Sequence, residues 1–183
     1  MDDVALGHAY RALAYGLIGE DGWRREMRRA RMRAESGIDN YTFAVIVLFE
    51  SWLAQWRNEP LECNALAQEV RDMASDELEF PARTAEVLQL WAHPMLSPHD
   101  QELAGRKAGE LRSLSDQWPL ITSADVQAPY FKTLLGQILL LRDRQDVTLE
   151  DIDRVCSGIE QAKAGAKVWL PELYRVRALL WVR

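Results

Sequence analysis

Apolar residues recur with helical spacing along most of the chain, and this recurrence is interrupted at four polar breaks. The breaks are centred at Gly19, Asn58, Ser97 and Arg144, which are 39, 39 and 47 residues apart. Each break joins an apolar helical stretch to a second, more charged one, and this order predicts a helix hairpin. A repeat of about 20–50 residues is typical of solenoids, because one hairpin cannot bury its apolar face without a stacked neighbour. The pattern therefore predicts an all-α, right-handed α-solenoid in a single domain, residues 1–183.

The predicted solenoid consists of four helix hairpins and one terminal helix. We expect the first helix of each hairpin to line the concave side of the solenoid. The hairpins are expected at residues 3–36, 41–76, 82–118 and 126–164, and the terminal helix at 170–183.

The third hairpin is the least regular of the four. Its first helix is expected to stop at His93-Pro94, because proline removes a backbone hydrogen bond and disfavours helical geometry in the residue before it. Residues 115–125, which include Pro119, are expected to form a longer connection to the fourth hairpin.

Three local signals predict where other helices begin and end. Gly37 is expected to end a helix in the left-handed conformation. Pro60 suits the first turn of a helix, where a backbone N–H has no intrahelical partner. Thr148 and Asp151 have the spacing of a capping box, in which a hydroxyl and a carboxylate satisfy free N–H groups.

Composition and charge exclude several classes of protein. The chain is 48% hydrophobic and 27% charged, which suffices for one domain that buries about 70% of its unfolded surface. Its net charge of −6 argues against a protein that coats nucleic acid or an anionic membrane. We therefore expect no nucleic acid and no membrane among its main partners.

The cysteines and the N-terminal residues indicate a cytoplasmic protein without a metal or cofactor. Cys63 and Cys156 are far apart and show neither disulfide nor zinc-site spacing. The longest uncharged apolar run, residues 41–49, is too short to span a bilayer. Asp2 and Asp3 stand where a signal peptide would carry basic residues.

Two stretches carry a resemblance to a known repeat family. In the first hairpin, Ala12, Tyr15 and Gly19 are followed by a small residue, Ala30. The second stretch is Gln127-Ala128-Pro129-Tyr130-Phe131 with Leu134-Leu135, then Gly165, then Leu170-Pro171-Glu172-Leu173-Tyr174-Arg175-Val176-Arg177. In these residues the chain resembles the tetratricopeptide-like (TPR-like) repeats of large bacterial signalling proteins, namely regulatory ATPases of the adenylate-cyclase-associated type and large transcriptional activators.

The resemblance implies a regulatory or partner-binding segment of a larger regulator, with no catalysis of its own. The chain departs from the repeat pattern at four positions. Asn58 and Arg144 stand where glycine is usual, Glu50 where an apolar residue is expected, and Pro94 interrupts the third repeat. No nucleophile with a neighbouring base is visible, so no catalytic residue is predicted.

The resemblance also implies a binding groove built on tryptophan. Repeat spacing makes Leu13, Trp52 and Trp91 equivalent, and this column tends to face the concave groove in such stacks. The predicted groove consists of Trp52, Trp56 and Trp91, with Gln55 as a polar contact, and it would take a protein, a peptide or a small effector. The alternative is that these tryptophans pack between helices, as apolar stripes with helical spacing usually do.

A second candidate surface is the arginine-rich helix near the N-terminus. Arg24, Arg25, Arg28 and Arg29 present guanidinium groups that suit phosphate or an acidic partner. The alternative is a solvated outer face, because exposed aromatic residues do not alternate with these arginines. A free-standing adaptor that uses residues 24–33 to bind an acidic partner or nucleic acid is thus a competing hypothesis. A small enzyme with an all-α site is another.

Overall fold

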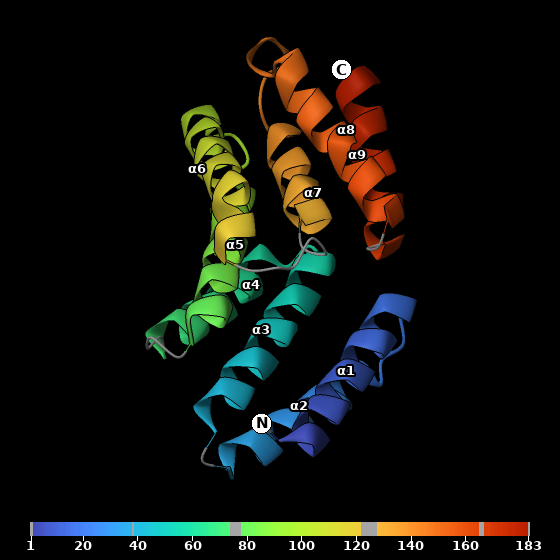
Figure 1. Ribbon diagram of the computed structural model, residues 1–183. Coiled ribbons are helices and arrows are strands. Elements are labelled where there is room, and N and C mark those ends of the chain that lie inside the picture. The colour runs from blue at the N-terminus through green and yellow to red at the C-terminus, as the bar shows by residue number, and fades with distance from the viewer. Residues whose placement is uncertain (1, 38, 74–77, 122–127, 165–166, 183) are drawn as a thin grey trace. The chain divides into compact units, whose positions relative to one another are not determined.

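The described residues of the computed structural model are 2–37, 39–73, 78–121, 128–164 and 167–182 (Figure 1). Within these ranges the chain forms nine α-helices, joined by turns and short 3₁₀ segments, and no β-strand. The predicted all-α class is therefore confirmed. The predicted boundaries at residues 76, 126 and 183 lie outside the described ranges, as do Gln127 and Gly165.

Contacts within the chain divide it into two compact units, Met1–Ala92 and His93–Arg183. The N-terminal unit contains α1 (Asp3–Ile18), α2 (Trp23–Glu35), α3 (Asn40–Trp56), α4 (Pro60–Asp72) and most of α5 (Glu79–Leu96). The C-terminal unit contains α6 (Gln101–Ile121), α7 (Ala128–Leu139), α8 (Leu149–Ala164) and α9 (Leu170–Val182). A single solenoid across both units stays a prediction.

In the N-terminal unit, helices α1 to α4 pack mainly against their neighbours in sequence. The α1–α2 and α3–α4 pairs make the most extensive contacts, and α1 also packs against α3. The interior between α1, α2 and α3 contains Ala9 and Ala12 of α1, Met27 and Ala30 of α2, and Leu53 of α3. Small residues on α1 bring the helices close together, since a Cβ at Gly16 would lie 2.3 Å from Leu53 Cδ2.

The turns at two of the predicted breaks need a left-handed residue. Gly19 has φ +78° and its neighbour Glu20 donates its N–H to Tyr15 O, which caps α1. Asn58 has φ +57° and Glu59 donates in the same way to Ala54 O. Asparagine is one of the few residues besides glycine that tolerate this conformation, which explains why it can replace the usual glycine here.

Gly37 does not take the left-handed conformation that the sequence predicted. Helix α2 ends at Glu35, and Ser36 caps it with φ −77° and ψ −9°, which is right-handed geometry. The prediction of the helix end was therefore correct to within two residues, while the predicted cap was wrong.

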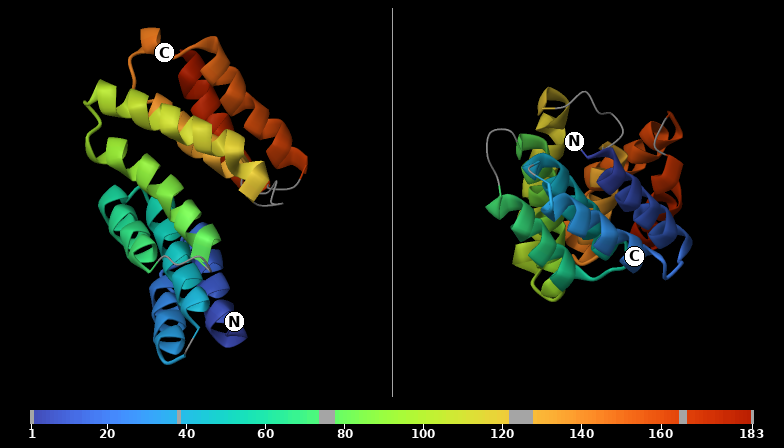
Figure 2. Two further views of the ribbon diagram at one scale, coloured as in Figure 1. Left: turned by 60° about the vertical axis from the view of Figure 1, so that its left-hand side comes forward. Right: turned by 90° about the horizontal axis from the view of Figure 1, so that it is seen from below.

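In the C-terminal unit, helices also pack mainly against their neighbours in sequence. Helix α7 packs against α6, α8 and α9, and Figure 2 shows α9, in red, beside the orange α8. Gly136 of α7 allows a close approach like that of Gly16 in α1, because a Cβ at Gly136 would lie 2.3 Å from Val176 Cγ1 of α9. The predicted capping box is confirmed: Asp151 N–H donates to Thr148 Oγ1, and Thr148 N–H donates to Asp151 Oδ2, both at 3.1 Å.

Two proline-based predictions were wrong. Helix α5 continues through Pro94 and ends at Leu96, so His93-Pro94 does not stop it. Pro94 and the preceding Trp91 and Ala92 are buried, and packing of this kind outweighs the one backbone hydrogen bond that proline removes. Helix α6 likewise continues to Ile121, so the first seven residues of the expected connection, 115–121, are helical.

Candidate functional site

The predicted tryptophan groove is divided between buried and partly exposed positions. Trp91 on α5 has no exposed surface, and Gln55 on α3 is buried as well. Trp52 and Trp56 are half-buried and pack against the interior of the N-terminal unit. Burial favours the packing interpretation for Trp91 and Gln55, since a groove residue has to be accessible to a partner.

Trp52 belongs to an aromatic cluster on α1 and α3. Its ring stacks on Phe49 at 5.2 Å and 19°, and Phe49 in turn contacts Tyr10 of α1 at 5.3 Å. Offset contacts of this kind stabilise the packing of the two helices. Tyr10 is exposed, so the edge of this cluster reaches the surface.

The predicted arginine patch lies on α2 but is split over two sides of it. Arg24 and Arg28 line one depression, together with the carboxylates Glu35, Glu50 and Glu62. Arg29 lines another, which faces α1. The four arginines therefore do not form one surface, because residues one apart in a helix point in different directions.

On the side of α2 that faces α1, the buried carboxylate of Glu26 binds several basic side chains. Glu26 is almost fully buried and accepts a hydrogen bond from Arg29 Nη1 at 2.9 Å and pairs with His8 Nδ1 at 2.8 Å. Arg11 and Arg25 lie 3.6 and 3.5 Å from its oxygens. The hydrogen bond with His8, reinforced by the charge of Arg29, lowers the pKa of Glu26 below its ordinary value.

This lowered pKa predicts how stability depends on pH. Glu26 should stabilise the fold fully above the ordinary pKa of 4.5, and the stabilisation should disappear as the pH falls through its folded-state value. We expect Glu26→Gln to be less stable than the wild type at neutral pH and to lose less stability on acidification. Urea unfolding over a pH series measures this, with the exposed Glu102→Gln as control. If the free energy of unfolding changed with pH to the same extent in the wild type and in Glu26→Gln, the stabilising role of the Glu26 carboxylate would be contradicted.

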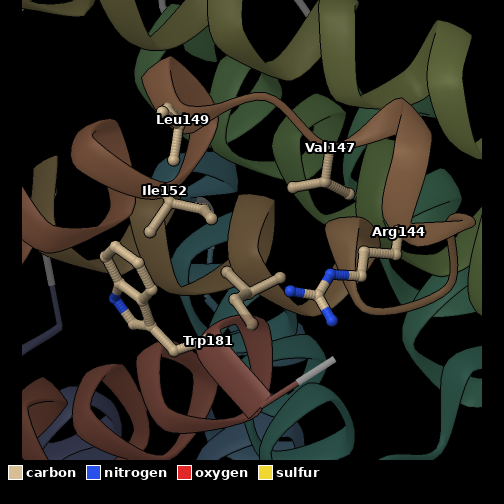
Figure 3. Close-up of a pocket in the computed structure, with 6 residues that line it drawn as sticks. Arg144, Val147, Leu149, Ile152 and Trp181 are labelled. Atoms are coloured by element: carbon tan, nitrogen blue, oxygen red, sulfur yellow. The ribbon is translucent and has the colours of Figure 1, made fainter.

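The C-terminal unit contains a pocket that the sequence did not predict (Figure 3). It lies where the start of α8 meets the end of α9, and its lining residues are Arg144, Val147, Leu149, Ile152, Leu180 and Trp181. Ile152 and Leu180 are buried and form its floor, while Leu149 and Trp181 are 69% and 57% exposed and form its rim. Figure 3 shows the guanidinium of Arg144 extending from the connection before α8 into the space between these side chains.

Several interactions hold the pocket walls in place. The capping box fixes the first turn of α8, and Asp151 of that turn also pairs with Arg112 Nη2 of α6 at 2.8 Å. Trp181 of α9 also interacts with the thiol of Cys156, which lies one turn beyond Ile152 on α8. Burial raises the pKa of this thiol, so Cys156 is a neutral partner at physiological pH.

The size and lining of the pocket define what it can bind. Its volume is about 140 Å³, which is smaller than the roughly 300–1,000 Å³ of most small-molecule sites and suits one apolar side chain. Its described lining offers apolar surface and one guanidinium, and contains no carboxylate, histidine or nucleophile. This arrangement favours recognition of an apolar group beside an anion.

Sequence reasoning missed this pocket because three separate segments form it. Arg144 was identified only as a break, and Leu149 and Ile152 only as members of an apolar stripe. Trp181 was assigned to the terminal helix. No signal in the sequence could have found the pocket, because the exposure of Leu149 and Trp181 becomes visible only once the two helices are packed.

No helix in the described parts of the chain is both long enough and apolar enough to cross a membrane. In these parts the structure consists of α-helices packed in sequential pairs, with contacts mainly between neighbouring helices. Comparison with protein-family models, curated proteins and solved structures finds no match to this chain.

Proposed function

We propose that this chain is a non-catalytic protein-interaction module built from TPR-like hairpins in a right-handed solenoid. In this proposal it is the regulatory segment of a larger bacterial signalling or transcription regulator. The regular spacing of the helix pairs supports the repeat class. So does the recurrence of one contact in both units, where a glycine of one helix, Gly16 or Gly136, meets a side chain two helices later.

The observation that carries the proposal is the pocket between α8 and α9. Leu149 and Trp181 keep most of their apolar surface in water. A partner that covers this surface gains about 25 cal/mol of binding free energy for each Å² that it removes from water. Tryptophan in such a position is common among residues that dominate binding energy. A partner that covers this rim gains affinity without any change in the fold.

Arg144 adds a preference for a negative group. Arg144 already has an interaction within the chain, but a guanidinium has five N–H donors, so it can also donate to a carboxylate of a partner. The expected ligand is therefore a protein segment in which an apolar side chain enters the pocket and an adjacent acidic residue meets Arg144. The enzyme alternative has no comparable support in this lining.

The test is a selection of short peptides from a displayed random library against the full chain. We expect the selected peptides to share an apolar residue next to an aspartate or glutamate. Trp181→Ala should weaken binding of a selected peptide by at least about fivefold, that is by more than about 1 kcal/mol. Arg144→Gln should weaken it to a similar extent. Fluorescence anisotropy with the labelled peptide measures both effects.

Two matched variants test whether the loss of any exposed apolar side chain, or of any exposed arginine, weakens binding. Leu61→Ala removes an exposed apolar side chain of α4, and Arg106→Gln removes an exposed arginine of α6. Both should bind the peptide as the wild type does. Peptides without acidic residues, or binding that Trp181→Ala leaves intact, would contradict the proposal. Loss of binding in Trp52→Ala alone would move the site to the aromatic cluster of α1 and α3.

A further inference from the structure

Helix α2 concentrates positive charge in a protein that is acidic overall. Its 13 residues contain six arginines and two glutamates, which give this helix a charge of +4 against −6 for the whole chain. Arg25, Arg29 and Arg33 are all more than half exposed. They follow one another at spacings of four residues, so they lie along one side of the helix.

An open groove runs between this side of α2 and the start of α1. Its lining consists of Val4, His8, Arg29, Met32, Arg33 and Ser36. Val4 and Met32 are the apolar members, and they are 58% and 63% exposed. Exposed apolar surface set among arginines is suited to a ligand that is both apolar and negatively charged.

The arginines beside the groove are already oriented. Arg29 Nη1 donates to Glu26 at 2.9 Å, and Arg33 Nε donates to Asp2 Oδ2 at 2.9 Å. A guanidinium has five N–H donors, so each of these contacts leaves donors that can bind a second carboxylate. Holding the side chains in place lowers the entropy that binding would otherwise cost.

The opposite side of α2 does not offer the same chemistry. There Arg24 and Arg28 share their depression with Glu35, Glu50 and Glu62, which repel a negatively charged ligand. Met32 borders both depressions. Charge therefore favours the α1 side, where none of the described residues that line the groove is acidic.

We propose that the groove of Val4, Met32, Arg29 and Arg33, with Arg25 one turn away, binds an acidic amphipathic segment of a protein partner. Apolar side chains of that segment cover Val4 and Met32, and its carboxylates pair with the arginines. A protein segment fits better than nucleic acid, because the lining residues that the structure describes include no aromatic side chain for base stacking. The carboxylates of Asp2 and Glu26, to which Arg33 and Arg29 donate, also disfavour a dense row of phosphates.

The experiment uses the full chain and a labelled synthetic helical peptide with leucines on one face and glutamates flanking them. Binding is measured by fluorescence anisotropy at low and at moderate salt. We expect the affinity to fall with added salt, since exposed charges are screened over about 10 Å at 0.1 M. The variant Arg25→Gln/Arg33→Gln should lower the affinity about tenfold. Met32→Ser should lower it several-fold without changing the salt dependence.

The control is Arg24→Gln/Arg28→Gln, which removes the same charge from the other side of the same helix. It should lower the affinity about threefold at most, through long-range charge alone. Equal losses in the two double variants would overturn the proposal, because they would show only nonspecific attraction to α2. No binding by the wild type at low salt, or tighter binding of a DNA duplex than of the peptide, would also overturn it.

Four further measurements separate the possible causes of a change in affinity. Circular dichroism of each variant verifies that helix content is retained. Because Arg33→Gln removes the contact with Asp2, the single variant Arg25→Gln is measured beside the double one. A peptide with lysine in place of glutamate should not bind. Trp181→Ala should leave this binding unchanged, so failure here and failure of the pocket between α8 and α9 are separate outcomes.

Discussion

Trp91→Ala is expected to lower the free energy of unfolding by about 3–5 kcal/mol. The indole of Trp91 has no exposed surface, so its removal leaves a cavity that the surrounding side chains fill only in part. Urea unfolding followed by far-ultraviolet circular dichroism measures the loss.

Trp181→Ala is the matched control, because it removes the same side chain from a position that is 57% exposed. Its stability should change by about 1 kcal/mol or less. The two variants should thus differ clearly in their free energy of unfolding, because Trp91 supports the fold and Trp181 is available to a partner. If Trp91→Ala unfolds at the same urea concentration as the wild type, the packing interpretation of Trp91 is wrong. The result would then favour the groove interpretation.

Gly136→Ala is expected to destabilise the C-terminal unit by about 1–3 kcal/mol. The added methyl group would lie 2.3 Å from Val176 Cγ1 and within 3.4 Å of both Val155 methyl groups, all on β-branched side chains with little rotational freedom. The helices α7 and α9 must move apart to admit it. Thermal or urea unfolding measures the effect.

Gly109→Ala provides the contrast, since a Cβ there meets no atom within 4 Å. In the interior of α6 it should stabilise the protein by about 0.5–1 kcal/mol, because alanine loses less backbone entropy than glycine. Adding Val176→Ala to Gly136→Ala should restore part of the lost stability. A Gly136→Ala protein as stable as Gly109→Ala would show that α7 and α9 are not in close contact.

Local sequence signals predicted the helices well, because each signal acts within a few residues. Helical spacing of apolar residues and the breaks at Gly19, Asn58 and Arg144 were sufficient to place the pairs α1–α2, α3–α4 and α7–α8. The same reasoning went wrong at Pro94, where a local rule about proline competes with the burial of Trp91 and Ala92. A rule based on neighbouring residues contains no information about such packing.

The sites were harder to predict than the helices. Periodicity predicted that Trp52 and Trp91 share a column, but it did not reveal that one is half-buried and the other fully buried. The rim of the pocket joins Leu149 and Trp181, which are far apart in sequence. Arginines near Met32 were recognised as a charged run, yet their division between two sides of α2 depends on where α1 and α4 lie.

The turn at Asn58 has a wider consequence for recognising helix ends in a sequence. Its φ of +57° shows that the position requires a backbone conformation, which glycine and asparagine both supply, and not one particular residue. A search that accepts only glycine at the end of a helix would overlook chains that form the same turn with asparagine. Describing each helix end by the dihedral angles it requires would group together sequences that differ in residue but share the turn.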